Sequence, residues 1–321
     1  DNHIYKVDII RGKFELLTKP SGRHKGVLNY NGRYFIHYHS SIDIPLISEI
    51  CNSYGENVKT LLKSSNPLNN YNISKTEFVT IKAEDNTSLY GRIIKPSDFD
   101  PNKKYPVMVY VYGGPHVQLV TNKWLGGGSL WMHYLAEKGF IIFTLDSRGS
   151  YNRGQEFEQI TFRNLGKIEI ADQLKGVEYL NSLDYVDTER LGVYGWSYGG
   201  YMTTSLMLKA PDVFKIGVAG GPVIDWKYYE VMYTERYMDT PKENPEGYKQ
   251  TSLLNHIDSL KGKLMIIHGS EDNVVVMQHS MDFLKHCIKK GKQLDFFVYP
   301  GHKHNVYGSD RVHLIYKITS Y

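Results

Sequence analysis

The chain has 321 residues, a formal net charge of +4 at pH 7 and 41% hydrophobic residues. This length allows one large domain, or one domain with part of another, and a sizeable core. The net charge is small for the length and no cluster of Lys and Arg occurs, so we expect no nucleic-acid partner. No apolar run approaches the roughly 18–20 residues of a membrane span, so none is expected in this chain.

The cysteines and the first residues bear on processing. The only two cysteines, Cys51 and Cys287, fall in regions that we assign to different domains. Two free, buried thiols are therefore expected in place of a disulfide framework.

The chain starts with Asp1-Asn2-His3, without an initiator Met or a signal-peptide pattern. This start favours a processed chain or a fragment from which targeting information has been removed.

The first 70 residues are predicted to form antiparallel hairpins, because apolar and polar residues alternate on both sides of turn-forming pairs such as Asn31-Gly32. The three pairs of strands are expected at residues 5–9 and 14–16, 27–30 and 34–39, and 45–51 and 57–62. Three hairpins bury little surface by themselves. We therefore predict that residues 1–70 are the C-terminal remnant of a β-propeller domain.

The pattern changes after a turn-rich linker at residues 64–70. Two strands, Thr76 to Lys82 and Leu89 to Lys95, precede the unbroken apolar run Val107 to Tyr112, which is typical of a strand covered on both faces. Strands and helices then alternate, which predicts an α/β fold with a doubly wound, mostly parallel sheet over residues 71–321. Strands are expected at 140–145, 190–194, 215–219, 263–267 and 294–299, and helices near 129–138, 168–183, 201–210, 277–290 and 310–320.

The segment Gly195-Trp196-Ser197-Tyr198-Gly199 has the pattern of a nucleophile elbow. It lies where the strand-like run Arg190 to Tyr194 gives way to the helix-like run Met202 to Ala210. A turn this sharp needs glycine on both sides, and it places the hydroxyl of Ser197 at a helix N-terminus, where backbone N–H groups favour a developing negative charge. A chance Gly-x-Ser-x-Gly in a loop is the alternative.

A serine nucleophile needs a base and a group that orients the base. The strand ending at His268 leads into Asp272, which we choose as the acid, and the last strand leads into His304, which we choose as the base. Glu271 stays open as the acid and His302 as the base.

His268 ends a strand and is more readily explained as a hydrogen-bonded core residue. With His302 and His304 it could form a zinc site, but no Cys cluster or His-Glu-x-x-His pattern supports one. We therefore expect no metal. The oxyanion needs donors: the amide of Tyr198 is one by geometry, whereas Tyr112 fits an oxyanion role and a purely structural one equally well.

Four motifs resemble the prolyl oligopeptidase family (S9), in its dipeptidyl peptidase IV and prolyl tripeptidyl aminopeptidase branch. They are Gly195-Trp196-Ser197-Tyr198-Gly199-Gly200, Asp146-Ser147-Arg148-Gly149-Ser150, Trp226-Lys227-Tyr228-Tyr229 and Tyr233-Thr234-Glu235-Arg236-Tyr237-Met238. The resemblance implies an α/β-hydrolase fold without a cofactor. It also implies a triad of Ser197, Asp272 and His304, with Tyr112 and the Tyr198 amide as the oxyanion hole.

The resemblance further implies a proline-accepting pocket. Its members would be Tyr198, Val223, Trp226, Tyr229, Tyr233 and Val275. A rigid pyrrolidine ring is well held between aromatic faces. The alternative, favoured by spacing alone, is that residues 222–237 form an amphipathic helix whose aromatic residues are core. Where dipeptidyl peptidase IV has an Asn, two positions after the catalytic Asp, this chain has Val274, so the prediction favours release of tripeptides over dipeptides.

We therefore predict a serine exopeptidase that releases N-terminal di- or tripeptides by cleavage after proline through an acyl-enzyme. An acyl-peptide hydrolase or esterase on the same fold and an inactive binding module are the alternatives. The expected partners are peptides with proline near a free N-terminus, and a homodimer is compatible with the sequence. The family binds the substrate amine with glutamates of the propeller that are not in this chain, and it implies a location in a bacterial periplasm or at the cell surface.

Overall fold

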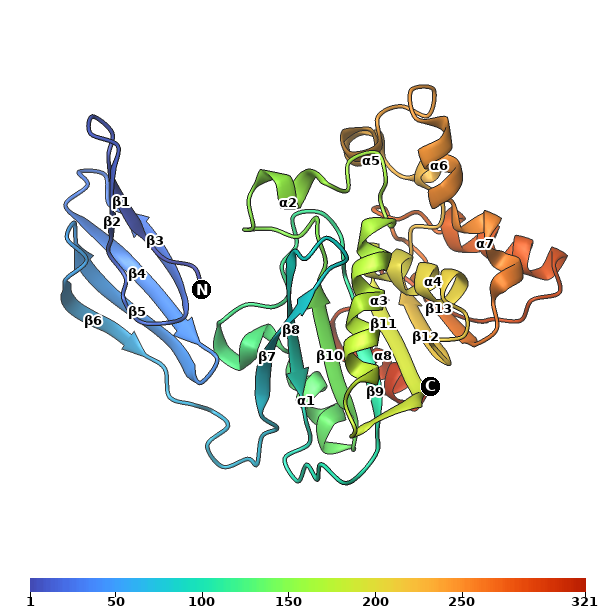
Figure 1. Ribbon diagram of the computed structural model, residues 1–321, viewed down its shortest axis with the longest axis horizontal. Coiled ribbons are helices and arrows are strands. Elements are labelled where there is room, and N and C mark those ends of the chain that lie inside the picture. Colours follow the sequence, from blue (N-terminus) through green and yellow to red (C-terminus); the bar gives the residue numbers. More distant parts are fainter.

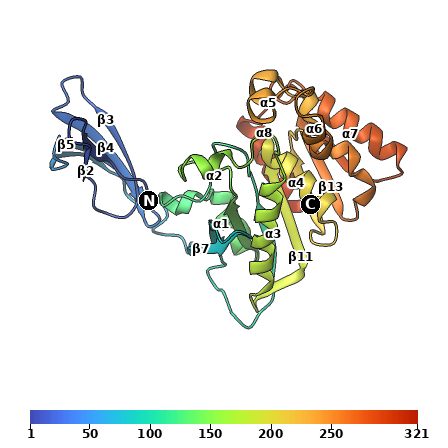
Figure 2. The ribbon, with the colours of Figure 1, turned by 45° about the horizontal axis from the view of Figure 1, so that its top comes forward.

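The computed structural model describes all 321 residues, which form two parts joined by a connection at residues 64–75 that contains turns but no helix or strand. In both orientations the first part, drawn in blue, stands beside the second, which runs from teal through green to red (Figures 1 and 2). The boundary predicted after residue 70 falls within the connection. None of the helices is both long enough and apolar enough to cross a bilayer.

The first part contains only antiparallel strands, as the hairpin pattern predicts. One sheet pairs β1 with β2, and the other has the order β3-β4-β5-β6. The second and third predicted hairpins are thus one continuous sheet, because the strand after Asn31-Gly32 pairs on both of its edges. The bounds are β1 (Tyr5–Asp8), β2 (Lys13–Leu16), β3 (Arg23–Leu28), β4 (Tyr34–Ser41), β5 (Ile44–Asn52) and β6 (Asn57–Lys63). The assignment of this part to a β-propeller stays a prediction.

The second part has an α/β-hydrolase fold built on an eight-stranded sheet of order β14-β13-β12-β11-β9-β10-β8-β7. Strands β9 to β14 are parallel to their neighbours among themselves, whereas β7 and β8 add an antiparallel edge. The bounds are β7 (Thr76–Lys82), β8 (Ser88–Ile94), β9 (Tyr105–Tyr110), β10 (Ile141–Asp146), β11 (Val186–Trp196), β12 (Ile216–Gly220), β13 (Lys263–Gly269) and β14 (Asp295–Tyr299).

Helices cover both faces of this sheet, because successive side chains of its central strands point to opposite sides. Val107 and Val109 of β9 belong to the main core, which includes residues of α3 and α4, whereas Met108 and Tyr110 pack on the side of α1. Helix α8 packs over the end of the sheet formed by β12, β13 and β14. The doubly wound arrangement predicted from the sequence is therefore confirmed.

The helices are α1 (Leu130–Glu137), α2 (Gln155–Gln159), α3 (Ile168–Asn181), α4 (Tyr198–Lys209), α5 (Val231–Met238), α6 (Pro245–Thr251), α7 (Gln278–Lys289) and α8 (Gly308–Ser320). The five helices predicted from periodicity correspond to α1, α3, α4, α7 and α8. The sequence predicts no helix at α2 or α6, because segments of five to seven residues carry little periodicity. Helix α5 begins within residues 222–237, where the alternative prediction is a longer amphipathic helix. Cys51 and Cys287 are free and buried, as predicted.

Candidate active site

Ser197 lies at a sharp turn between the central strand β11 and helix α4, which begins at the next residue. Its backbone has φ 62° and ψ −118°, a conformation that residues with a side chain rarely adopt and that is found at functional turns. A Cβ atom on Gly195 would collide with the carbonyl oxygens of Gly199 and Val111. The flanking glycines therefore allow the turn that aims the hydroxyl outward from the sheet.

Asp272 and His304 come from the loops that follow β13 and β14, two neighbouring strands. His304 Nδ1 lies 2.7 Å from Asp272 Oδ2, and Asp272 Oδ1 accepts hydrogen bonds from the amides of Val274 and Val275, both at 2.9 Å. Burial alone would raise the pKa of Asp272, but hydrogen bonds from His268 and His304 hold it well below the usual range of a carboxyl group. The carboxylate thus stays ionised and orients the His304 ring.

The serine turn and the histidine loop meet at Gly220 and Gly221, at the end of β12. The Ser197 amide donates to Gly220 O at 2.8 Å, and a Cβ on Gly221 would lie 3.3 Å from His304 Cε1. Trp196 Nε1 also donates to the carbonyl of His304 at 2.7 Å. Ser197 and His304 are not joined by a hydrogen bond in this structure, and such bonds are often loose when no substrate is bound.

The competing residues have other surroundings. Glu271 is exposed, and His302 Nε2 pairs with Asp310 Oδ2 at 2.8 Å on the exposed side of α8. His268 is fully buried, with Ser280 Oγ and Val275 O each 2.7 Å from one of its ring nitrogens. This is the hydrogen-bonded core histidine that the sequence favours, and the geometry points to Asp272 and His304 as the acid and the base.

The predicted pocket residues gather around the nucleophile. A small hollow is lined by Tyr112, Ser197, Tyr198, Val223, Trp226, Tyr229 and Tyr233. Val275 is not among them. It is fully buried below the acid loop, where its amide contacts Asp272, so its predicted role as a substrate contact stays untested.

The aromatic residues of the hollow also pack on one another. Trp226 is 1% exposed and stacks on Tyr233 with ring centroids 6.0 Å apart and an angle of 12° between the planes. The alternative of one amphipathic helix over residues 222–237 is not what the structure contains: a short 3-10 turn at Trp226–Tyr228 precedes helix α5. The rings thus form a rigid wall that is partly core and partly pocket.

Tyr112 follows the central strand β9 and reaches the same hollow. Burial raises the pKa of its hydroxyl, so the group keeps its proton and is available as a hydrogen-bond donor. The hydroxyl of Tyr198 donates to the carboxyl group of Glu169, so only the backbone amide of Tyr198 is available to an oxyanion. Tyr112 and Tyr198 thus line the same hollow as Ser197, and their roles as oxyanion donors stay predictions.

Sequence reasoning missed Glu169, a fully buried residue in the first turn of α3. It accepts a hydrogen bond from the Tyr198 hydroxyl at 2.6 Å and from the Gly166 amide at 3.0 Å. Burial, the largest cause, raises its pKa to about 7. A single Glu in a first helical turn is usually solvated, so its sequence context carries no signal of this contact.

The fold defines this protein as an α/β hydrolase, with a serine at the turn where that class carries its nucleophile. The chain belongs to the prolyl oligopeptidase family, whose model matches residues 129–321.

Named relatives support this assignment. Human dipeptidyl peptidase 8 is 33% identical over 322 residues, which cover 95% of this chain and 36% of the relative. The crystal structure of dipeptidyl peptidase 4 from Porphyromonas gingivalis has a TM-score of 0.94 at 35% identity, and that of a candidate dipeptidyl aminopeptidase IV from Bacteroides ovatus has 0.96 at 51%. Each covers 99% of this chain, which in turn covers 45% of each solved chain. The chain spans about a third of the length of the curated relatives it matches.

Proposed function

We propose that this chain carries the catalytic machinery of a serine exopeptidase that removes short peptides from free N-termini by cleavage after proline. The observation that carries the proposal is the hollow around Ser197, whose walls are almost entirely aromatic or aliphatic. A pyrrolidine ring is compact, rigid and apolar, so aromatic faces are well suited to contact it. The dipeptidyl peptidase names of the relatives support the removal of short peptides, while the preference for proline rests on the hollow.

The reaction follows from the position of each group. The hydroxyl of Ser197 attacks the carbonyl carbon of the residue held in the hollow, and His304 takes the hydroxyl proton while Asp272 stays ionised. The Tyr198 amide and the Tyr112 hydroxyl donate to the oxyanion. His304 then gives its proton to the leaving amine, and water hydrolyses the acyl-enzyme with His304 as the base.

The length of the released peptide is the finer point. The presence of Val274 and the local likeness to tripeptidyl aminopeptidases favour tripeptides. The segments concerned are Val218 to Trp226, Glu243 to Tyr248, His302 to Val306 and Asp310 to Leu314. The names of the relatives refer to dipeptides. The proposal includes both dipeptides and tripeptides as products, and the relative rates on Gly-Pro and Ala-Ala-Pro reporters should distinguish them. A homodimer and a periplasmic or cell-surface location stay predictions.

Reporter substrates test the specificity. We expect hydrolysis of Gly-Pro or Ala-Ala-Pro esters or amides, little hydrolysis of the Gly-Ala and Ala-Ala-Ala analogues, and covalent labelling of Ser197 by a fluorophosphonate probe. Ser197→Ala should abolish both signals, whereas Ser182→Ala, at an exposed position after α3, should change neither. Labelling without any preference for proline would favour the acyl-peptide hydrolase or esterase alternative. A failure of Ser197 to label would favour the inactive binding module.

The two adjacent carboxylates provide a second test. In Asp272→Asn the amide can still occupy the same space, but it favours the wrong tautomer of His304, so kcat should fall by about 10³–10⁴ with a small change in KM. Glu271→Gln removes an exposed charge one residue away and should leave kcat within about twofold. Equal losses in the two variants would contradict the assignment of the acid.

A further inference from the structure

A cluster of histidines in the first part of the chain lies outside the candidate active site. His24 on β3 pairs directly with His39 on β4, and His37, two residues earlier on β4, pairs directly with Glu49 on β5. Residues two apart on a strand share a face, so these side chains project together. The rings of His24, His37 and His39 stack with centroids 5.1–5.3 Å apart, and His3 stacks on His24 at 5.1 Å.

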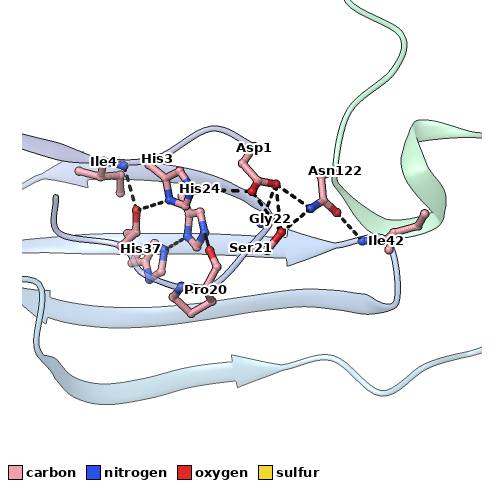
Figure 3. A network of polar contacts seen from close by, with 11 residues as sticks. Asp1, His3, Ile4, Pro20, Ser21, Gly22, His24, His37, Ile42 and Asn122 are labelled. Carbon is pink, nitrogen blue, oxygen red and sulfur yellow. Dashed lines mark hydrogen bonds and ion pairs between the residues drawn. The ribbon is translucent and has the colours of Figure 1, made fainter. Parts of the chain in front are cut away.

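The hydrogen bonds fix which ring nitrogens carry protons (Figure 3). His24 Nε2 lies 2.8 Å from the carbonyl of Pro20, which can only accept, so His24 must carry its hydrogen there. The Nδ1 of a neutral His24 is then an acceptor, and it takes the hydrogen of His37 Nε2 at 2.8 Å. The remaining nitrogen of a neutral His37, Nδ1, is left with a lone pair.

That lone pair faces a carboxylate. His37 Nδ1 lies 3.3 Å from Glu49 Oε2, and the side chains of His37 and Glu49 are only 8% and 18% exposed. Two acceptors at this distance need a proton or a metal cation between them.

His39 completes the arrangement. One ligand atom of each of His37, His39 and Glu49 lies within 4.8 Å of the others, and the Nδ1 of His39 is buried without any hydrogen-bond partner. Two imidazoles and one carboxylate, with one position left for water, form a donor set that Zn²⁺ accepts in proteins. A third imidazole, His24, accepts a hydrogen bond from His37 Nε2 through its own Nδ1 and would therefore orient the His37 ring.

We propose that His37, His39 and Glu49 bind one divalent transition-metal ion of the Zn²⁺ type, with His24 orienting His37. The site is independent of the proposed peptidase activity, because none of its residues touches the hollow around Ser197. The metal would tie together β4 and β5 and fix the tautomers of the stacked rings.

Titration of the metal-free chain with Zn²⁺ against a chromophoric chelator tests the proposal. We expect one Zn²⁺ per chain, a rise in Tm with added Zn²⁺, and visible absorption typical of a low-symmetry site when Co²⁺ replaces Zn²⁺. Glu49→Gln is the sharpest variant, because the new amide can donate to His37 Nδ1 and accept from Asn57 as Glu49 does. It should keep or raise the metal-free Tm and lose Zn²⁺ binding.

His39→Gln should also lose binding, and His24→Gln should weaken it by about 10–100-fold. His286→Gln, on the distant helix α7, is the matched control and should bind as the parent does. Far-UV circular dichroism without metal establishes that each variant is folded. Absence of stoichiometric Zn²⁺ binding by the folded parent, or binding by Glu49→Gln and His39→Gln equal to that of His286→Gln, would overturn the proposal and leave a shared proton as the link between His37 and Glu49.

Discussion

Glu169 is a buried carboxyl group that contacts the wall of the candidate substrate pocket. Its carboxyl group holds the hydroxyl of Tyr198, whose ring lines the hollow and whose amide is an expected oxyanion donor. No cation pairs with Glu169, so the hydrogen bonds from Tyr198 and Gly166 are its compensation for burial. The residue therefore acts on the pocket through its neighbour, as a positioning residue.

The raised pKa of Glu169 gives stability a defined pH dependence. The pKa of Glu169 is about 7 in the folded chain and 4.5 as the ordinary value. Between pH 4.5 and 7 the folded chain therefore retains a proton that the unfolded chain loses. The free energy of unfolding should therefore fall as the pH rises through this window, by about 1.4 kcal/mol per pH unit and about 3 kcal/mol in all. Above pH 7 the effect of Glu169 on this free energy should no longer change with pH. Urea unfolding of the parent and of Glu169→Gln from pH 4.5 to 8 measures this difference.

The matched control is Glu178→Gln, an exposed position on the same helix that pairs only with Lys175. This variant should reproduce the pH profile of the parent, whereas Glu169→Gln should show a flatter one. Identical slopes for the parent and Glu169→Gln would show that Glu169 does not titrate in this range.

Single residues also show the limit of sequence reasoning. Asp272 and His304 could be proposed because each follows a predicted strand, and parallel strands bring such loops to one edge. Glu169 and the pair His37–Glu49 could not, because their partners are set by helix packing and strand register. Neither of these is encoded in local periodicity.

At the scale of elements, the turn after β11 depends on close backbone packing. In Gly195→Ala the added methyl group meets two carbonyl oxygens that belong to neighbouring elements, so the turn must shift. We expect a loss of about 1–3 kcal/mol in the free energy of unfolding and slower labelling of Ser197 by a fluorophosphonate. Urea unfolding and the labelling rate measure the two effects.

Gly192→Ala, on the same strand, is the control. The nearest atoms to its added Cβ are Ile216 O at 3.5 Å and Val107 O at 3.9 Å, which is ordinary contact. An alanine in a strand interior gains about 0.5–1 kcal/mol over glycine, so this variant should be neutral or more stable. Similar destabilisation of both variants would mean that an added methyl group disturbs β11 wherever it is placed, and that the close packing of the turn is not the cause.

The sequence pattern predicted all the strands of the large sheet, because the central ones contain apolar runs such as Val107 to Tyr110 and Leu264 to Ile267. The strand order could not be predicted. β9 lies between β10 and β11, and β8 pairs with β10, so chain order and spatial order diverge at the centre of the sheet.

At the scale of the whole molecule, one side chain joins the two parts. Asn122 donates to Asp1 Oδ1 at 2.7 Å and to Ser21 Oγ at 2.9 Å, and it accepts from the Ile42 amide at 2.9 Å (Figure 3). Asn122→Ala removes all three bonds, each worth about 1 kcal/mol. We expect the connection at 64–75 to be cleaved several times faster in limited proteolysis.

Asn181→Ala, an exposed change at the end of α3, should leave this rate unaltered. A rate for Asn122→Ala equal to that of the parent would show that other contacts, such as Leu125 N to Ile42 O, hold the two parts together.

The hydrogen bond from the Trp196 indole to the His304 carbonyl has a consequence for how activity is lost. The bond joins residues that are 108 positions apart in the chain and holds the turn with Ser197 next to the loop with His304. Separation of β14 and α8 from the edge of the sheet would break this hydrogen bond before the rest of the domain unfolds. The proposed activity should then be lost on heating before the helical circular dichroism signal falls, so β14 and α8 would set its thermal limit.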